Sequence, residues 1–237
     1  WGQTIVQTTP IANGVKFDKI NFQNEYHHIF GRGRWINEGA KDTTYLEGEF
    51  ATENLGKFLS VNDITQNFEA KEGSVKFNIR WLGSPMKFQL KTLEGYASLD
   101  VKDGVIPLSG DAAKNGLGKV LTLFSAQSIQ RRLQLNFSDL SDNGYSFNSL
   151  ISIMHFQGGN AKVEKGAFDG PEAKIGFTGR LGLVKQDYDL YLVVTPYVTS
   201  SLPLLATLAG GPIAGVATYA FDKIAAGSIA KFTSYKY

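Results

Sequence analysis

Three histidines are the side chains best suited to hold a metal or move a proton, but their spacing does not form a site. They are His27, His28 and His155, and the chain contains no cysteine. Adjacent residues of a strand point to opposite faces, so His27 and His28 cannot chelate one metal together. No HExxH or EF-hand spacing is present. The sequence therefore predicts structural histidines, no metal and no cofactor, and the lack of cysteine excludes disulfides and thiolate chemistry.

The motifs of common enzymes are also incomplete. No Gly-x-Ser-x-Gly elbow is present, and the Gly-Lys pair at 118–119 is followed by Val120, where a phosphate-binding loop needs Ser or Thr. Asp187 and Asp189 share one strand face, which favours a solvated surface over a glycosidase pair. A catalytic triad of scattered residues stays open as an alternative, but no pattern favours it. We therefore expect a protein that is not an enzyme.

The composition indicates a folded β protein of balanced charge. Charged residues make up 19% of the 237 residues, and the formal net charge is only +2. This balance argues against nucleic-acid binding, which needs a clustered basic surface. The 26 glycines and the 12% aromatic content are typical of many short strands and turns, and they exclude a disordered chain.

Alternation with a period of two dominates from residue 14 onward and predicts strands with one apolar face. Strands are expected near 14–23, 26–36, 43–50, 75–81, 87–92, 97–101, 133–137, 145–156, 161–165, 172–178 and 187–195. Turn signals at 13–14, 103–104, 143–144 and 158–159 separate several of these segments. The short connections favour antiparallel pairing.

Three segments have helical rather than strand spacing. The first begins near Leu55, the second runs over about 111–132, and the third covers 202–229 with a break at 210–212. Residues 190–221 contain no charge, yet three prolines interrupt any straight membrane-spanning helix. The last segment therefore either covers the apolar sheet or contacts a membrane surface, and both readings stay open.

An apolar sheet face of this size must be covered or used. About three helices are few for roughly a dozen strands, so we expect an exposed hydrophobic groove. We expect its lining to consist of the alternating apolar residues Val75, Phe77, Ile79, Trp81, Ala97, Leu99, Val101, Ala173, Ile175, Phe177, Leu190, Leu192 and Val194. The candidates for membrane contact are Leu204, Leu205, Leu208, Ile213 and Val216. A charge introduced in the lining, as in Ile175→Asp or Leu99→Lys, is expected to impair function more than folding.

Four stretches resemble the C-terminal region of the YhdP family, AsmA-like envelope proteins of Gram-negative bacteria. They are FNIRWLGSP at 77–85, LKTLEGYASLDVKDGVI at 90–106, GLGKVLTLFSAQSIQRRLQLNFSDLSDNGYSFNS at 116–149, and FDGPEAKIGFTGRLGLVKQDYDLYLVVTPYVTSSLPLLATLAGGPIAGV at 168–216. Their order along the chain is more specific than any single stretch.

The resemblance implies a mainly β fold: an elongated, twisted antiparallel sheet curled into an open, taco-like groove. It further implies a periplasmic protein anchored in the inner membrane, which carries phospholipid acyl chains toward the outer membrane without catalysis. Residues 1–237 would form one domain at the distal end of that groove, as part of a longer chain. Its partners would be phospholipid and either the inner leaflet of the outer membrane or an envelope protein.

Two other hypotheses remain beside lipid transport. One is a scaffold or protein-binding β module whose sheet closes over an ordinary core. The other is an enzyme such as a glycan hydrolase on a β-sandwich. Lipid extracted from the purified protein would separate the first of these from a transport function.

Overall fold

The computed structural model describes residues 2–39, 41–62, 68–106, 145–171, 173–185 and 187–197. The segments predicted as helices at 111–132 and 202–229, the strand at 133–137 and the turn at 143–144 lie outside these residues. The five candidates for membrane contact lie outside them as well.

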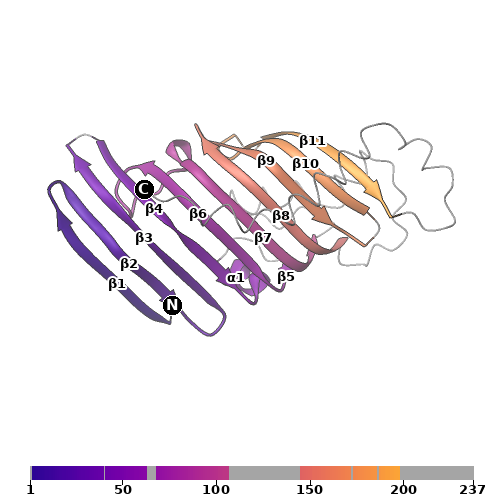
Figure 1. Ribbon diagram of the computed structural model, residues 1–237, viewed down its shortest axis with the longest axis horizontal. Coiled ribbons are helices and arrows are strands. Elements are labelled where there is room, and N and C mark those ends of the chain that lie inside the picture. Colours follow the sequence, from indigo (N-terminus) through magenta and orange to yellow (C-terminus); the bar gives the residue numbers. More distant parts are fainter. Residues whose placement is uncertain are drawn as a thin grey trace.

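One antiparallel sheet of 11 strands makes up nearly all of the described chain (Figure 1). Ten strands follow one another in the order β1-β2-β3-β4-β6-β7-β8-β9-β10-β11, and the two-residue β5 pairs with β7. The strands are β1 (Gln3–Ile11), β2 (Gly14–Gln23), β3 (His27–Glu38), β4 (Lys41–Thr52), β5 (Glu69–Ala70), β6 (Gly73–Leu82), β7 (Glu94–Ile106), β8 (Tyr145–Gln157), β9 (Asn160–Asp169), β10 (Ala173–Gly182) and β11 (Asp187–Pro196). The prediction of a mainly β, antiparallel fold is confirmed.

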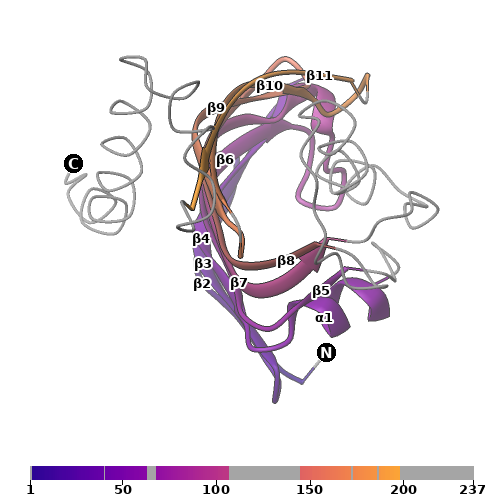
Figure 2. The same cartoon turned by 90° about the vertical axis from the view of Figure 1, so that its right-hand side faces the viewer.

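The sheet is open and curled. Strands β1 and β11 form the two ends of the pairing order, so the described sheet does not close on itself. Viewed along its length in Figure 2, the sheet bends into a C-shaped section with a concave and a convex face. The connections between strands lie along two rims, called upper and lower here as they appear in Figure 1.

The one α-helix among the described residues is α1 (Leu55–Val61), at the lower rim. Asn54 caps it, because its side chain accepts a hydrogen bond from the Lys57 backbone N–H. Leu55 and Leu59 fall four residues apart on the buried side, as their spacing predicts. The described part contains one of the about three helices expected, because the segments 111–132 and 202–229 lie outside it, and it adds a single 3₁₀ turn at Leu90–Thr92.

Two other expectations about local structure are wrong. The segment 87–92 is not a strand but a loop that ends in a 3₁₀ turn, where the Thr92 and Leu93 amides donate to the Gln89 and Leu90 carbonyls. The Asp103-Gly104 pair is not a turn either. It lies inside β7, where Asp103 has φ of 49° and the strand changes its partner from β6 to β5.

The structure also contains a first strand that the sequence did not predict. Strand β1 has no clear alternation, and eight of its nine residues are exposed. As the end strand of the sheet it packs on one neighbour only, so its sequence carries little apolar signal. The predicted turn at Gly158-Gly159 is confirmed: both glycines have positive φ, as a two-residue hairpin turn requires.

Candidate functional site

The registers of the sheet align apolar residues into rows that cross every strand. Residues directly opposite each other in an antiparallel pair point to the same face, so the pairings can be followed from strand to strand. One row consists of Val6, Ile20, Gly31, Gly48, Phe77, Ala97, Met154, Val163, Gly179 and Leu190. It runs from β1 to β11 and contains no charged residue.

Parallel rows on the same face have the same character. The next consists of Phe22, Ile29, Phe50, Val75, Leu99, Ser152, Gly166, Phe177 and Leu192. A third consists of Phe17, Gly33, Leu46, Ile79, Gly95, Phe156, Ala161, Leu181 and Tyr188. Together the rows form one uncharged face, which is the candidate site.

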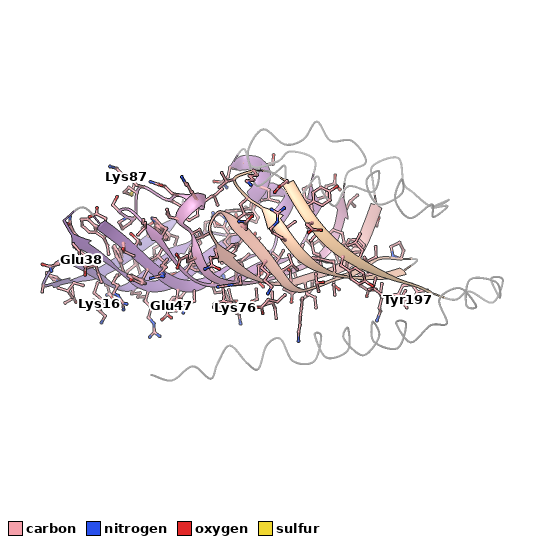
Figure 3. All side chains as sticks on the ribbon, turned by 90° about the horizontal axis from the view of Figure 1, so that it is seen from above. Lys16, Glu38, Glu47, Lys76, Lys87 and Tyr197 are labelled. Atoms are coloured by element: carbon pink, nitrogen blue, oxygen red, sulfur yellow. The ribbon has the colours of Figure 1, made fainter. Side chains whose placement is uncertain are left out.

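This face is the concave one. Helix α1 packs against it at the lower rim, where the Phe58 ring lies 4.5 Å from the Phe50 ring. Residues one position along each strand point the other way, and in Figure 3 the labelled Lys16, Glu47 and Lys76 project from the opposite side of the sheet. The curl of the sheet therefore encloses the apolar rows rather than the charged ones.

The predicted lining residues whose side chains the structure describes belong to this face. Phe77, Leu99 and Phe177 lie in the rows described above. Trp81 lies two residues beyond Ile79 in β6, so it shares the same face, and it pairs with Thr44 of β4. Val101 and Ile175 occupy a further row that joins them through β8 and β9. Ala173 and Val194 occupy the corresponding strand positions in β10 and β11. That these residues line a lipid path stays a prediction.

Sequence reasoning missed other residues of the same rows. In the N-terminal strands they are Phe17, Ile20, Phe22, Ile29, Leu46 and Phe50. In the later strands they are Leu150, Met154, Phe156, Ala161, Val163, Phe168 and Leu181. Glycines interrupt the apolar alternation in β3 and β4, and consecutive apolar residues obscure it in β8. Pairing each strand with its neighbour would have found them.

The convex face carries ion pairs between neighbouring strands. Arg32 binds Glu47, the Lys76 Nζ lies 3.8 Å from Glu49, and the Arg80 Nε donates to Glu94 at 3.0 Å. These side chains are largely exposed, so each pair contributes little to stability. Their placement keeps charge on the outer face and away from the apolar rows.

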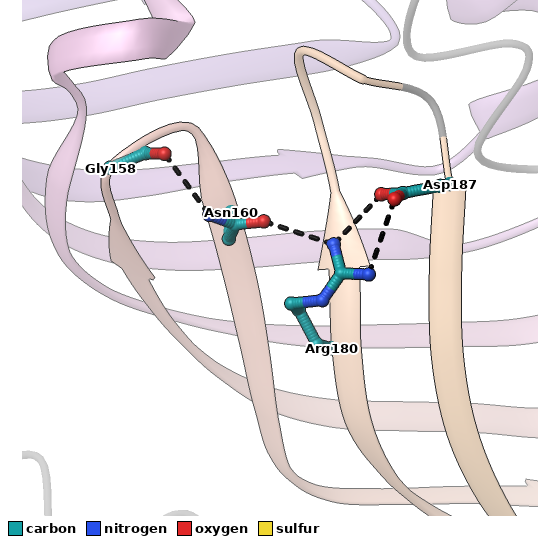
Figure 4. A network of polar contacts seen from close by, with 4 residues as sticks. All are labelled: Gly158, Asn160, Arg180 and Asp187. Carbon is teal, nitrogen blue, oxygen red and sulfur yellow. Dashed lines mark hydrogen bonds and ion pairs between the residues drawn. The ribbon is translucent and has the colours of Figure 1, made fainter.

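The best connected of these pairs lies at the upper end of β9, β10 and β11 (Figure 4). The Arg180 guanidinium donates to both Asp187 oxygens, at 2.7 and 3.3 Å, and to the Asn160 side chain at 3.1 Å. The hydrogen bonds from Arg180 lower the pKa of Asp187. The network thus joins three strands on the outside, and it engages Asp187 in an ion pair rather than in catalysis.

Burial differs along the concave face. No apolar side chain of β1 to β4 is buried, whereas Val101, Val163, Phe168 and Phe177 are at most 5% exposed. These four residues belong to one cluster, which also includes Leu55 and Leu59 of α1, Phe68 and Phe147. The same apolar face is therefore half open in β1 to β4 and packed in β7 to β10.

The three histidines lie apart in the structure. His27 belongs to the concave face, with its ring 5.2 Å from the Phe58 ring, and burial lowers its pKa. His28 lies on the convex face, and His155 stacks on Tyr96 at 4.5 Å. No group of three potential metal ligands occurs within the described residues. The helix that the structure describes is too short to span a bilayer.

The comparisons with known proteins agree with this geometry. The "Intermembrane phospholipid transporter YhdP" of Escherichia coli (strain K12) is 24% identical to the chain over 217 residues, which are 92% of this chain and 16% of that protein. The chain thus spans about a sixth of the length of the relative that it matches. No solved structure matches it. The family profile described as "YhdP protein" covers residues 1–237, and the chain therefore belongs to the YhdP family.

Proposed function

We propose that the concave face binds phospholipid acyl chains and that the chain is one section of a groove that carries phospholipid across the periplasm between the inner and outer membranes. The observation that carries the proposal is the set of uncharged rows, which cross the sheet without a break. The name of the Escherichia coli relative, an intermembrane phospholipid transporter, supports the same substrate.

The length of the rows favours a path over a single binding pocket. Ten strands about 4.8 Å apart give a row of about 43 Å. A lipid tail extends about 15 Å, half of a hydrocarbon core of about 30 Å. A row is therefore longer than one lipid tail, and a lipid could move along it while its tails stay covered.

The energetics explain why such a path needs no catalytic group. Moving one CH₂ from a hydrocarbon environment into water costs about 0.8 kcal/mol, so a two-tailed lipid crosses water extremely slowly. An uncharged face lowers this cost at every position, while the headgroup stays in water at the open side. The proposed activity is accordingly non-catalytic transport.

The N-terminal strands are the best place for the tails. Phe17, Ile20, Ile29 and Leu46 keep part of their apolar surface exposed on the concave face. An acyl chain along these residues would cover surface that the protein itself leaves in contact with water. The single domain of residues 1–237 and an inner-membrane anchor elsewhere in the longer chain are parts of this proposal. So is a distal contact with the outer membrane or an envelope protein, including residues 202–229.

One observation favours the alternative of a closed scaffold module. The cluster of Val101, Val163, Phe168 and Phe177 is packed like an ordinary protein core. If the whole face were filled in this way, the chain would present its convex side to a partner and would bind no lipid.

A matched pair of substitutions in β3 tests the proposal. Ile29 lies on the concave face, and its neighbour Phe30 lies on the convex face, where it is 54% exposed. We expect phospholipid in organic extracts of the purified protein, measured by mass spectrometry. Ile29→Asp should lower the phospholipid content several-fold, because a carboxylate would face the tails. Phe30→Asp introduces the same charge on the other face and should leave it unchanged.

Thermal melting followed by circular dichroism shows whether both variants remain folded. Wild-type protein that carries no phospholipid would contradict the proposal. Equal phospholipid content in two folded variants would also contradict it and favour the closed module.

A further inference from the structure

The upper rim carries apolar side chains that are exposed in the described part of the structure. Met86 is 93% exposed, and Leu82, Phe88 and Val184 are each about half exposed. Leu82 ends β6, Met86 and Phe88 lie in the loop 83–93 between β6 and β7, and Val184 lies in the turn 183–185 after β10. We call these four residues, with Lys87, Lys91 and Lys185, the upper-rim patch.

The loop that carries most of the patch is held in place. The Trp81 indole donates to the Ser84 carbonyl at 3.2 Å, and the Phe88 ring packs edge-on against Trp81 at 5.2 Å. The Gly83 N–H donates to the Asp42 carbonyl at 2.8 Å. Met86 and Phe88 are therefore presented to solvent by a bonded loop.

The second turn of the patch adjoins the first loop. The Leu183 N–H donates to the Gly159 carbonyl at 2.9 Å, which ties the β10–β11 turn to the β8–β9 turn. A Cβ at Gly159 would lie 2.8 Å from the Val184 side chain and 3.7 Å from the Lys91 Cα. The two parts of the patch thus meet around Gly159 and form one surface.

The charge of the patch has one sign. Residues 82–93 and 183–185 contain three lysines and no aspartate or glutamate. The nearest carboxylates along the chain, Glu94 and Asp187, are paired with Arg80 and Arg180. The charges within the patch itself are therefore all positive, and Asp42, whose carbonyl accepts from the Gly83 N–H, is a neighbouring carboxylate. Figure 3 shows Lys87 on the opposite side of the sheet from Lys16 and Lys76.

We propose that the upper-rim patch docks on the surface of an anionic phospholipid bilayer. Exposed apolar side chains that enter the acyl boundary, with lysines at the level of anionic headgroups, are the pattern of interfacial membrane binding. Met86 is 93% exposed and would enter the acyl boundary, while the adjacent Lys87 would lie at the level of the headgroups. Docking here places the open side of the concave face beside the bilayer.

This inference rests on the proposed function only for its biological purpose, because vesicle binding is measured separately from lipid carriage. The absence of cysteine allows a single reporter. Met86→Cys, labelled with the environment-sensitive dye NBD, should shift its emission to the blue with vesicles containing phosphatidylglycerol but not with pure phosphatidylcholine. Val61→Cys is the matched control, since Val61 is 73% exposed on α1 at the lower rim.

A charge-matched pair of triple variants completes the test. The variant K87Q/K91Q/K185Q should weaken binding to anionic vesicles about 100-fold at low salt, at about five-fold for each lysine. The variant K16Q/K76Q/K165Q removes the same charge from the convex face and should bind within a few-fold of wild type. Flotation with liposomes measures both.

Three results would overturn the proposal. They are equal emission shifts at positions 61 and 86, equal losses in the two triple variants, and shielding of position 86 by a protein partner but not by vesicles. Phospholipid in organic extracts remains an independent measure. A chain that carries lipid but does not dock here would refute this inference alone, and a chain that docks without carrying lipid would refute the proposed function.

Discussion

The two ends of the sheet share one pattern and differ in what covers it. In β1 to β4 the concave face has no buried apolar side chain, whereas in β7 to β10 the same face includes buried residues such as Ala97, Val163 and Phe177. Val6 is 46% exposed and Val163 is 1% exposed, although both belong to one row. Alternation therefore determines which face a residue occupies, and the packing of other side chains against that face determines its burial.

The difference has a physical source in apolar residues outside the three rows. Phe68 and Phe147, with Leu55 and Leu59 of α1, join the cluster that buries the later part of the face. No described segment of this kind packs over the concave face of β1 and β2. The first strands consequently offer apolar surface for a ligand, and the later strands supply the core that stabilises the fold.

The largest expected effect comes from placing the same charge at the two ends of one row. Val163→Asp would bury an unpaired carboxylate and should lower the free energy of unfolding by several kcal/mol, a large part of the total stability of a typical domain. Ile20→Asp, in the half-exposed part of the row, should cost about 1 kcal/mol or less. Chemical denaturation measures both, and equal losses would mean that the two ends are not different.

This contrast shows what the sequence could and could not predict. The alternation of Phe77 and Leu99 with polar neighbours correctly predicts their shared face. The alternation does not predict how deeply each residue is buried: Ile175 is 5% exposed within the cluster, whereas Leu46 is partly exposed. The structure therefore changes one expectation: Ile175→Asp should impair folding itself. Burial depends on long-range contacts that a local pattern does not encode.

Local chemistry explains the other successes and failures. The cap at Asn54 and the spacing of Leu55 and Leu59 made α1 predictable. Strand β1 has no such signal, since it pairs on one side only. The 87–92 segment has strand-like residues, but the backbone N–H groups of Lys87 and Thr92 donate to carbonyls within the same loop rather than to a neighbouring strand. The candidate site was hardest to predict where glycines replace apolar side chains in the rows.

A glycine pair within β10 gives a smaller effect and sharpens the description of the packed end. Gly179 has φ of 133°, and a Cβ there would lie 2.2 Å from the Asp189 carbonyl oxygen. Gly179→Ala should cost about 1–3 kcal/mol from the backbone conformation alone, measured by thermal or chemical unfolding. Gly176→Ala in the same strand meets only the Val193 carbonyl at 4.0 Å and should be nearly neutral. Equal costs would show that Gly179 does not need its positive φ beside the irregular pairing of 177–179 with β9.

The smallest expected effect concerns His27, where α1 covers the concave face of β3. The Asn24 side-chain Oδ1 accepts from the Tyr26 and His27 backbone N–H groups, both at 2.9 Å, which directs the Asn24 Nδ2 toward the His27 Nε2 at 3.1 Å. A ring nitrogen facing a donor must be unprotonated, and burial against Phe58 lowers the pKa of His27 below its ordinary 6.5 in the same direction. The unfolded chain therefore binds the proton first as pH falls. The free energy of unfolding should be highest above about pH 7 and should decrease slightly toward pH 5.

His27→Gln should remove this part of the pH dependence in denaturation measured across that range, and His28→Gln on the convex face should leave it unchanged. If His27→Gln keeps the full slope, then α1 does not hold this histidine neutral, and the N-terminal strands are more open at the lower rim than the structure indicates.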